Sequence, residues 1–121
     1  MLVVDSSPVE PTTLRVKERD GFRIAEVVGD LDLSNVDAIL RALREASDGQ
    51  DALVISLEHC DYSDSHGLAM LVALVRQSTA RLVIAASRRT RRLFEITGVD
   101  KILEISESVD GALLTLSRRA Q

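Results

Sequence analysis

The chain is poor in aromatic side chains and in positive charge. It contains no Trp, one Tyr and two Phe among 121 residues, so it offers few surfaces on which nucleic-acid bases or sugar rings could stack. Its formal net charge is −4, whereas proteins that bind nucleic-acid phosphates cluster Lys and Arg in excess. We therefore expect no nucleic-acid partner.

The sequence also shows no sign of disulfides, a secretion signal or a membrane-spanning segment. Cys60 is the single cysteine, and a chain with no disulfide framework is typical of a reducing compartment. The first residues lack the basic and apolar regions of a signal peptide. The longest apolar run, residues 68–75, falls well short of the roughly 18 residues that a spanning helix needs. We expect a cytoplasmic protein that does not insert into a membrane.

The residues that are present favour one globular domain. Hydrophobic residues make up 45% and charged residues 28% of the chain, which is the balance of an ordinary folded protein. Pro8 and Pro11 interrupt an opening segment with no hydrophobic period. We expect residues 1–11 to form a flexible N-terminal arm and residues 12–121 to form a single domain.

Hydrophobic spacing predicts alternating strands and helices. Residues 13–18 and 22–28 are β-prone runs on either side of Asp20-Gly21, a dipeptide typical of tight hairpin turns. Ser34 then precedes an amphipathic helical pattern as its candidate N-cap. Further strands are expected at 52–57, 81–86 and 101–105, and further helices at 65–76, 87–97 and around 109–116. The order β-β-α-β-α-β-α-β-α predicts an α/β fold with a mainly parallel sheet of about five strands and about four helices.

Three segments together resemble a known family, the STAS domain. They are Gly29-Asp-Leu-Asp-Leu33, Asp64-Ser-His-Gly-Leu68 and Arg92-Leu-Phe-Glu-Ile-Thr-Gly-Val99. In order and spacing they are similar to the family's Gly-acidic-Leu-Asp turn, its Asp-Ser-Ser/Thr-Gly-Leu loop and its late helix that ends in a Gly-Leu or Gly-Val step. The resemblance covers residues 13–117 and implies the STAS-type fold.

The resemblance also implies a function, that of an anti-sigma factor antagonist. In the family's switch members, the Ser after the loop Asp is phosphorylated by an ATP-dependent serine kinase that is also the anti-sigma factor; here that residue is Ser65. The unphosphorylated form binds the kinase and releases a sigma factor, and a PP2C-type phosphatase restores that form. The chain would then be a substrate rather than an enzyme and would need no cofactor. It departs from the pattern at His66, where switch members carry Ser or Thr.

Ser65 lies where a buried strand gives way to a helix, so its hydroxyl is expected at the sheet edge and open to a partner. The simpler interpretation is that Ser65 merely caps the helix, as Ser commonly does. Around it we predict a partner-binding surface made of Asp30, Asp32, Tyr62, Ser63, Asp64, His66, Gly67 and Met70.

The helix that follows Ser65 is apolar on both sides of its wheel. Such a helix is either buried all round or leaves an apolar strip exposed for docking. Met70 is the residue we expect on an exposed strip, and full burial is the alternative.

Four arginines, Arg88, Arg89, Arg91 and Arg92, stand in the first turns of the third expected helix, where the helix dipole disfavours cations. They form either a solvated basic face or a site for an acidic partner or a phosphate.

Other chemistries have little support in the sequence. Asp64-Ser65-His66 holds the residue types of a hydrolytic triad, but consecutive residues do not align in that way. His59, Cys60, Asp61 and His66 do not have the spacing of a zinc site. Two rival functions remain: a STAS scaffold or subunit of a transport or signalling complex that is not phosphorylated, and an enzyme or small-ligand sensor with an enclosed polar pocket.

Overall fold

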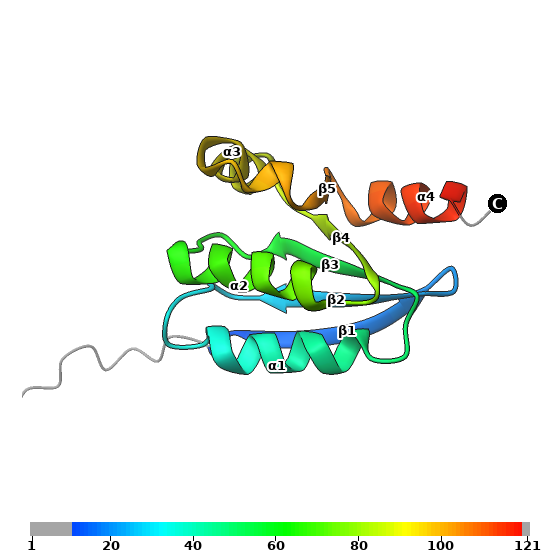
Figure 1. The fold of residues 1–121 in the computed structure, drawn as a ribbon, viewed down its shortest axis with the longest axis horizontal. Helices are drawn as coiled ribbons and strands as arrows, with labels where there is room; N and C mark the ends of the chain where they lie inside the picture. Colours follow the sequence, from blue (N-terminus) through cyan, green and yellow to red (C-terminus); the bar gives the residue numbers. More distant parts are fainter. Residues whose placement is uncertain (1–10, 120–121) are drawn as a thin grey trace, which may run out of the picture.

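A computed structural model describes residues 11–119, which form a five-stranded sheet with helices on both faces (Figure 1). The strands are β1 Thr13–Arg19, β2 Phe22–Val28, β3 Ala52–His59, β4 Arg81–Ala85 and β5 Glu104–Ser106. The helices are α1 Val36–Ser47, α2 Ser65–Gln77, α3 Arg88–Thr97 and α4 Val109–Arg119, with a short 3-10 helix, η1, at Val99–Lys101. The predicted α/β fold and element order are confirmed.

The sheet has the strand order β1-β2-β3-β4-β5 and is mainly parallel, as predicted. Only β1 and β2 are antiparallel; β2–β3, β3–β4 and β4–β5 pair in parallel. The β1–β2 hairpin turns at Asp20 and Gly21, whose φ angles are 55° and 82°. Positive φ at both positions is what a tight hairpin turn requires, so the Asp-Gly prediction is confirmed.

The core has two layers, one on each face of the sheet. On one face α1, α2 and Phe94 of α3 pack against residues such as Val27 and Ile55. On the other face α4 contributes Leu113 and Leu116, which pack with Val54. Strand β3 is buried on both faces, as its continuous apolar run predicts.

The parallel topology brings the starts of two helices together. Strands β2 and β3 are neighbours and run in the same direction, so the connections that leave their carboxyl ends lie at one edge of the sheet. Helices α1 and α2 follow these connections and begin at the same end of the molecule (Figure 1). The segments on either side of Ser65 and around Asp30 thus become neighbours.

Two local predictions are wrong. The N-cap of α1 is Asn35 rather than Ser34, and Asn35 makes no side-chain capping bond; Ser34 instead directs its backbone N–H and its hydroxyl to Asp32 Oδ1. Lys101, the predicted start of the last strand, instead ends η1, and β5 begins three residues later than predicted, at Glu104. A left-handed Gly98, with φ of 80°, ends α3 and leads directly into this extra turn.

The N-terminal arm expected at residues 1–11 lies almost entirely outside the described residues, and that prediction stays untested. Among the helices of residues 11–119, none has the length and apolar character to cross a membrane.

Candidate functional site

Two turns meet at the carboxyl edge of β2 and β3. Leu31 and Ser63 form an isolated parallel bridge. The backbone N–H of Leu31 donates to Tyr62 O at 2.9 Å, and the N–H of Asp64 donates back to Leu31 O at 3.1 Å. The turn after β2 and the loop before α2 are therefore held in one fixed arrangement.

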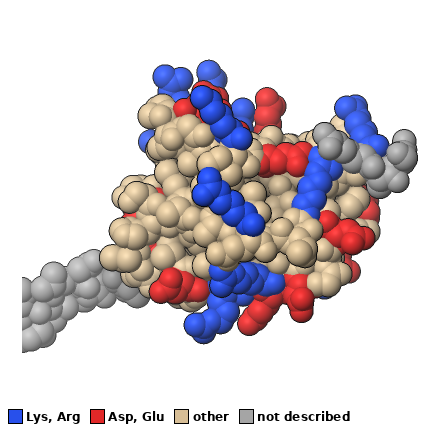
Figure 2. Space-filling view, in the orientation of Figure 1, with Lys and Arg blue, Asp and Glu red and all other residues tan. Residues whose placement is uncertain are grey.

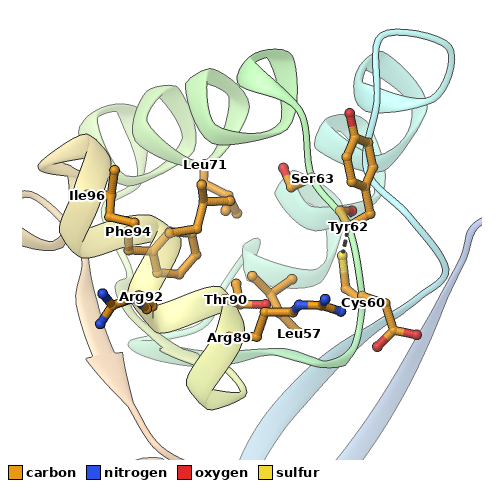
Figure 3. A pocket seen from close by; sticks show the side chains of 12 residues that line it. Leu57, Cys60, Tyr62, Ser63, Leu71, Arg89, Thr90, Arg92, Phe94 and Ile96 are labelled. Carbon is orange, nitrogen blue, oxygen red and sulfur yellow. Dashed lines mark hydrogen bonds between the residues drawn. The ribbon is translucent and has the colours of Figure 1, made fainter.

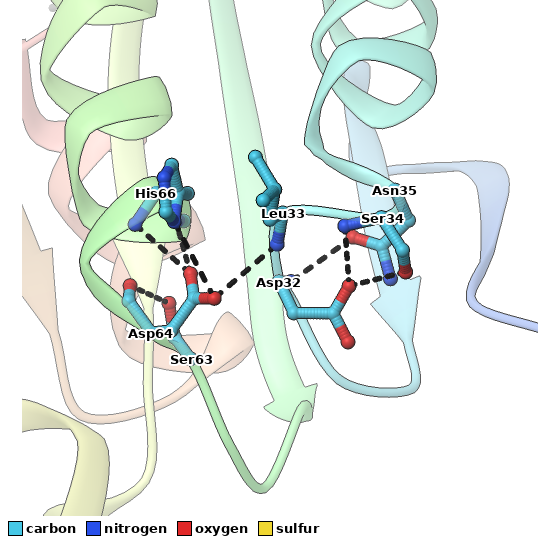
Figure 4. A network of polar contacts seen from close by, with 8 residues as sticks. Asp32, Leu33, Ser34, Asn35, Ser63, Asp64 and His66 are labelled. Atoms are coloured by element: carbon cyan, nitrogen blue, oxygen red, sulfur yellow. Dashed lines mark hydrogen bonds and ion pairs between the residues drawn. The ribbon is translucent and has the colours of Figure 1, made fainter.

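The Asp64 carboxylate connects these two turns and begins α2 (Figure 4). Asp64 is the N-cap of the helix, and its Oδ1 accepts hydrogen bonds from the backbone N–H groups of His66 at 2.9 Å and Gly67 at 3.1 Å. Its Oδ2 accepts from the N–H of Leu33, in the opposite turn, at 3.2 Å. Desolvation acts to raise the pKa of Asp64, but the three backbone donors outweigh it and the pKa lies below its ordinary value.

Ser65 is the first residue of α2 and is exposed. Because Asp64 supplies the cap, the interpretation that Ser65 merely caps the helix is wrong. Within residues 11–119 the Ser65 hydroxyl makes no hydrogen bond, in contrast to the Ser63 hydroxyl, which donates to Asp64 O at 3.1 Å. The Ser65 oxygen is therefore open to a partner, as the sequence predicted.

Gly67 allows the two turns to approach so closely. A Cβ atom on Gly67 would lie 2.2 Å from Ser63 Oγ and 3.0 Å from Leu31 Cβ, distances at which atoms overlap. Gly67 is buried, so this predicted site residue acts by its small size beneath the surface rather than as a contact residue.

Comparisons with known proteins agree with this geometry. The family model described as "STAS domain" matches residues 13–112. The chain belongs to the STAS domain family. It is 31% identical over 109 residues to the anti-sigma-B factor antagonist of Staphylococcus aureus strain NCTC 8325, a match that covers 84% of this chain and 94% of that protein.

Two mycobacterial proteins are also similar to this STAS domain. The anti-sigma-F factor antagonist RsfB of Mycobacterium tuberculosis strain CDC 1551 / Oshkosh is 30% identical over 111 residues, covering 88% of this chain and 91% of that protein. The crystal structure of an anti-sigma factor antagonist from Mycobacterium paratuberculosis superposes with a TM-score of 0.79 at 28% identity, covering 87% of this chain and 93% of that one. These relatives are regulatory proteins, named for antagonism of anti-sigma factors.

The acidic turn of the STAS domain is partly occupied by its own contacts. Asp32 Oδ1 accepts from the backbone N–H of Ser34 at 2.9 Å. Asp30 is exposed, and its carbonyl oxygen accepts from Asn35 Nδ2 at 2.9 Å. Within residues 11–119 the Asp30 carboxylate thus makes no hydrogen bond or ion pair, whereas the Asp32 carboxylate holds its own turn.

His66 lies beside the same carboxylate. Its Nδ1 is 3.6 Å from Asp64 Oδ2, and its side chain is 51% exposed. The ring is thus placed at the surface next to Ser65, where the sequence predicted a partner contact.

Met70 does not lie on an exposed strip, and that expectation is wrong. Only 5% of Met70 is exposed, because it belongs to the core layer that contains α1 and α2. Among the apolar residues of α2, Ala69 is exposed and Val72 and Ala73 are half-buried, and with Val99 they line a separate shallow groove.

Two exposed apolar side chains belong to the turns that Asp64 and its loop connect. Tyr62, predicted as a partner contact, is 57% exposed. Leu33 is 66% exposed and was missed as a site residue, although it ends the same motif as Asp30 and Asp32. The sequence signal that could have found Leu33 is its place as the last residue of the Gly29–Leu33 motif. In the structure Leu31 is fully buried, and the chain turns at Leu33 and exposes its side chain.

Proposed function

We propose that this STAS domain is an anti-sigma factor antagonist controlled at Ser65. In its unphosphorylated form it would bind a serine-kinase anti-sigma factor and so release a sigma factor. Phosphorylation of Ser65 by that kinase would end the binding, and a PP2C-type phosphatase would restore it. The observation that carries the proposal is the open Ser65 hydroxyl at the start of α2, directly after the capping Asp64. The antagonist names of the similar proteins support it.

The surface around an unmodified Ser65 suits a protein partner. Leu33, whose backbone N–H binds Asp64, and Tyr62, in the loop before Asp64, expose apolar area on the two turns that meet at the start of α2. Aromatic side chains are enriched at protein interfaces, while charge is depleted at their centres. A partner could therefore bury Leu33, Ser65 and Tyr62 together without burying a charge at Ser65 itself.

A phosphoryl group would change this surface by its charge, about −1.5 to −2 at neutral pH. The start of a helix normally offers backbone N–H groups to such an anion. Here Asp64 already accepts from the N–H groups of His66 and Gly67. The phosphoryl group would thus compete with Asp64 for its donors or remain beside it as a second anion.

Both outcomes weaken the unphosphorylated arrangement. Competition would loosen the bond from Leu33 N–H to Asp64 Oδ2, which joins the two turns. Without competition, Leu33 and Tyr62 would flank a strongly anionic group that a partner must desolvate. In both cases the surface around phosphorylated Ser65 would no longer be complementary to a partner that binds the uncharged, unphosphorylated surface.

Binding measurements with Ser65 variants test the proposal. Ser65→Ala should bind the cognate serine-kinase anti-sigma factor as the unmodified protein does, in the presence of ATP as well as in its absence. Ser65→Asp should bind at least about tenfold more weakly, because burying an unpaired charge costs more than 1.4 kcal/mol. Ser117→Asp, at an exposed position of α4 on the opposite face of the sheet, serves as the control for added negative charge and should bind as the unmodified protein does. Equal binding by Ser65→Ala and Ser65→Asp would contradict the switch and favour a STAS scaffold that is not phosphorylated.

A further inference from the structure

A crevice of about 580 Å³ lies between α3 and the loop that joins β3 to α2 (Figure 3). Its floor consists of Leu57, Leu71 and Phe94, each at most 1% exposed. Two exposed side chains stand along its rim, Tyr62 at 57% and Ile96 at 72%. The crevice is thus an apolar depression between two apolar ridges.

The rim also carries positive charge. Arg89 and Arg92 of α3 line the crevice, and basic side chains gather over α3 on the surface (Figure 2). Within residues 11–119 neither guanidinium forms an ion pair or a hydrogen bond. Asp61, a carboxylate on the same lining, is paired with neither of them.

The fold does not account for these two arginines. The first turn of α3 holds no acidic residue, and a cation in that turn, such as Arg89, is disfavoured by the helix dipole. Arg91, in contrast, has structural partners: its Nε donates to Ala86 O at 3.2 Å and its Nη1 lies 3.8 Å from Glu107. Arg89 and Arg92 therefore add unpaired charge beside an apolar crevice in a chain whose net charge is −4.

We propose that this crevice is a docking site for an acidic segment of a protein partner. An apolar side chain of that segment would sit between Tyr62 and Ile96. Asp or Glu residues next to it would meet Arg89 and Arg92, whose planar guanidinium groups can each hold a carboxylate through two hydrogen bonds. This site goes beyond the proposed switch, since binding in the crevice does not depend on whether Ser65 is phosphorylated.

A protein segment fits the crevice better than a free small molecule does. The floor residues are already closed off from solvent, whereas small-ligand pockets enclose most of the ligand surface. The solvent-accessible apolar area belongs instead to Tyr62 and Ile96 at the rim, where Arg89 and Arg92 also lie. Tyr and Arg are the residue types that contribute most at protein interfaces.

The site is continuous with the loop that leads into Ser65 at the start of α2. Tyr62 and Ser63 line the crevice, and Ser65 begins α2 two residues after Ser63. A partner held here would lie next to Ser65 whether or not that residue is modified. The crevice could therefore add affinity to a complex that also covers Ser65.

Selection from a library of random peptides of about twelve residues tests the proposal. The full-length protein serves as bait. The peptides that it enriches should carry Asp or Glu within one or two residues of Leu, Ile, Met or Phe. Arg89→Glu/Arg92→Glu should weaken these peptides at least about tenfold, and Ile96→Ala should weaken them to a smaller extent. Arg88→Glu/Arg118→Glu is the matched control, because it changes the net charge equally at arginines that do not line the crevice, and it should retain most of the binding.

Several results would overturn the proposal. One is that the protein enriches no peptides, and another is that the enriched peptides lack the acidic and apolar pattern. A third is that both double variants lose binding equally although circular dichroism shows that they are folded. Octanoate that binds in the crevice where no peptide does would make it a small-ligand site. Self-association that only Arg89→Glu/Arg92→Glu abolishes would assign it to a second copy of the chain. Because no kinase or ATP is present, these results are independent of whether Ser65 is phosphorylated.

Discussion

Asp64 Oδ2 accepts a hydrogen bond from the backbone N–H of Leu33 at 3.2 Å. This contact joins the turn after β2 to the start of α2, so a single carboxylate caps the helix and also fixes the neighbouring turn. Changes at Ser65 can therefore reach Leu33 through one side chain.

Asp64→Asn should separate the two roles of this carboxylate. An Asn side chain has one acceptor oxygen and one amide nitrogen, so it cannot accept from α2 and from Leu33 N–H through both side-chain atoms. We expect faster amide hydrogen exchange at Leu33 with a smaller change in the middle of α2. Unchanged exchange at Leu33 would show that the contact does not hold the turn.

Acid should weaken the same contact. The pKa of Asp64 is lowered in the folded state, so its contribution to stability is present above the ordinary Asp value of about 3.9 and is lost as the pH falls through the lower folded value. The urea midpoint should therefore fall more steeply below about pH 4 in the unmodified protein than in Asp64→Asn. Parallel curves for the two proteins would contradict this assignment.

Gly67→Ala should destabilise the protein by about 1–3 kcal/mol, the usual cost of overpacking. The added Cβ meets Ser63 Oγ at 2.2 Å and Leu31 Cβ at 3.0 Å. Ser63→Ala/Gly67→Ala removes the first overlap but leaves the second, so it should recover part of the loss measured by urea unfolding. A Gly67→Ala protein as stable as the original would show that the two turns are not packed as described.

Cys60 should react slowly in the folded protein. Cys60 is 3% exposed and its thiol donates to Tyr62 O at 3.4 Å, and burial raises the pKa of that thiol. Because the thiolate is the reactive form, labelling by iodoacetamide at pH 8 should be far slower than in the urea-unfolded chain. Equal rates would mean that the loop between β3 and α2 opens readily.

Much of the fold could be predicted from local patterns. Three features each depend on a few neighbouring residues: the Asp20-Gly21 hairpin, the apolar run of β3 and the end of α3 at Gly98. The position of β5 could not be predicted, because the 3-10 turn at 99–101 follows only once Gly98 adopts its left-handed conformation.

The site depended more on tertiary contacts. Ser65 and Asp64 were found from their motif, but only the structure shows that Asp64 takes the capping role and leaves the Ser65 hydroxyl open. Met70 was misplaced because a helix that is apolar all round does not reveal which side faces α1.

The surroundings of Glu26, inside the sheet, could not be predicted from the sequence either. This residue falls in the predicted strand, yet it is only 7% exposed and is faced by Arg15, Lys17 and His59 from two neighbouring strands. This arrangement depends on the register of β1 and β3 against β2, which the sequence pattern does not contain.

The most direct test of the central claim is to map phosphate after incubation with the cognate serine-kinase anti-sigma factor and ATP. Mass spectrometry should find one phosphoryl group, on Ser65, in the original protein and in Ser63→Ala, and none in Ser65→Ala. An unlabelled Ser65, under conditions in which the kinase phosphorylates a known substrate, would contradict the account. So would a phosphate carried by another residue.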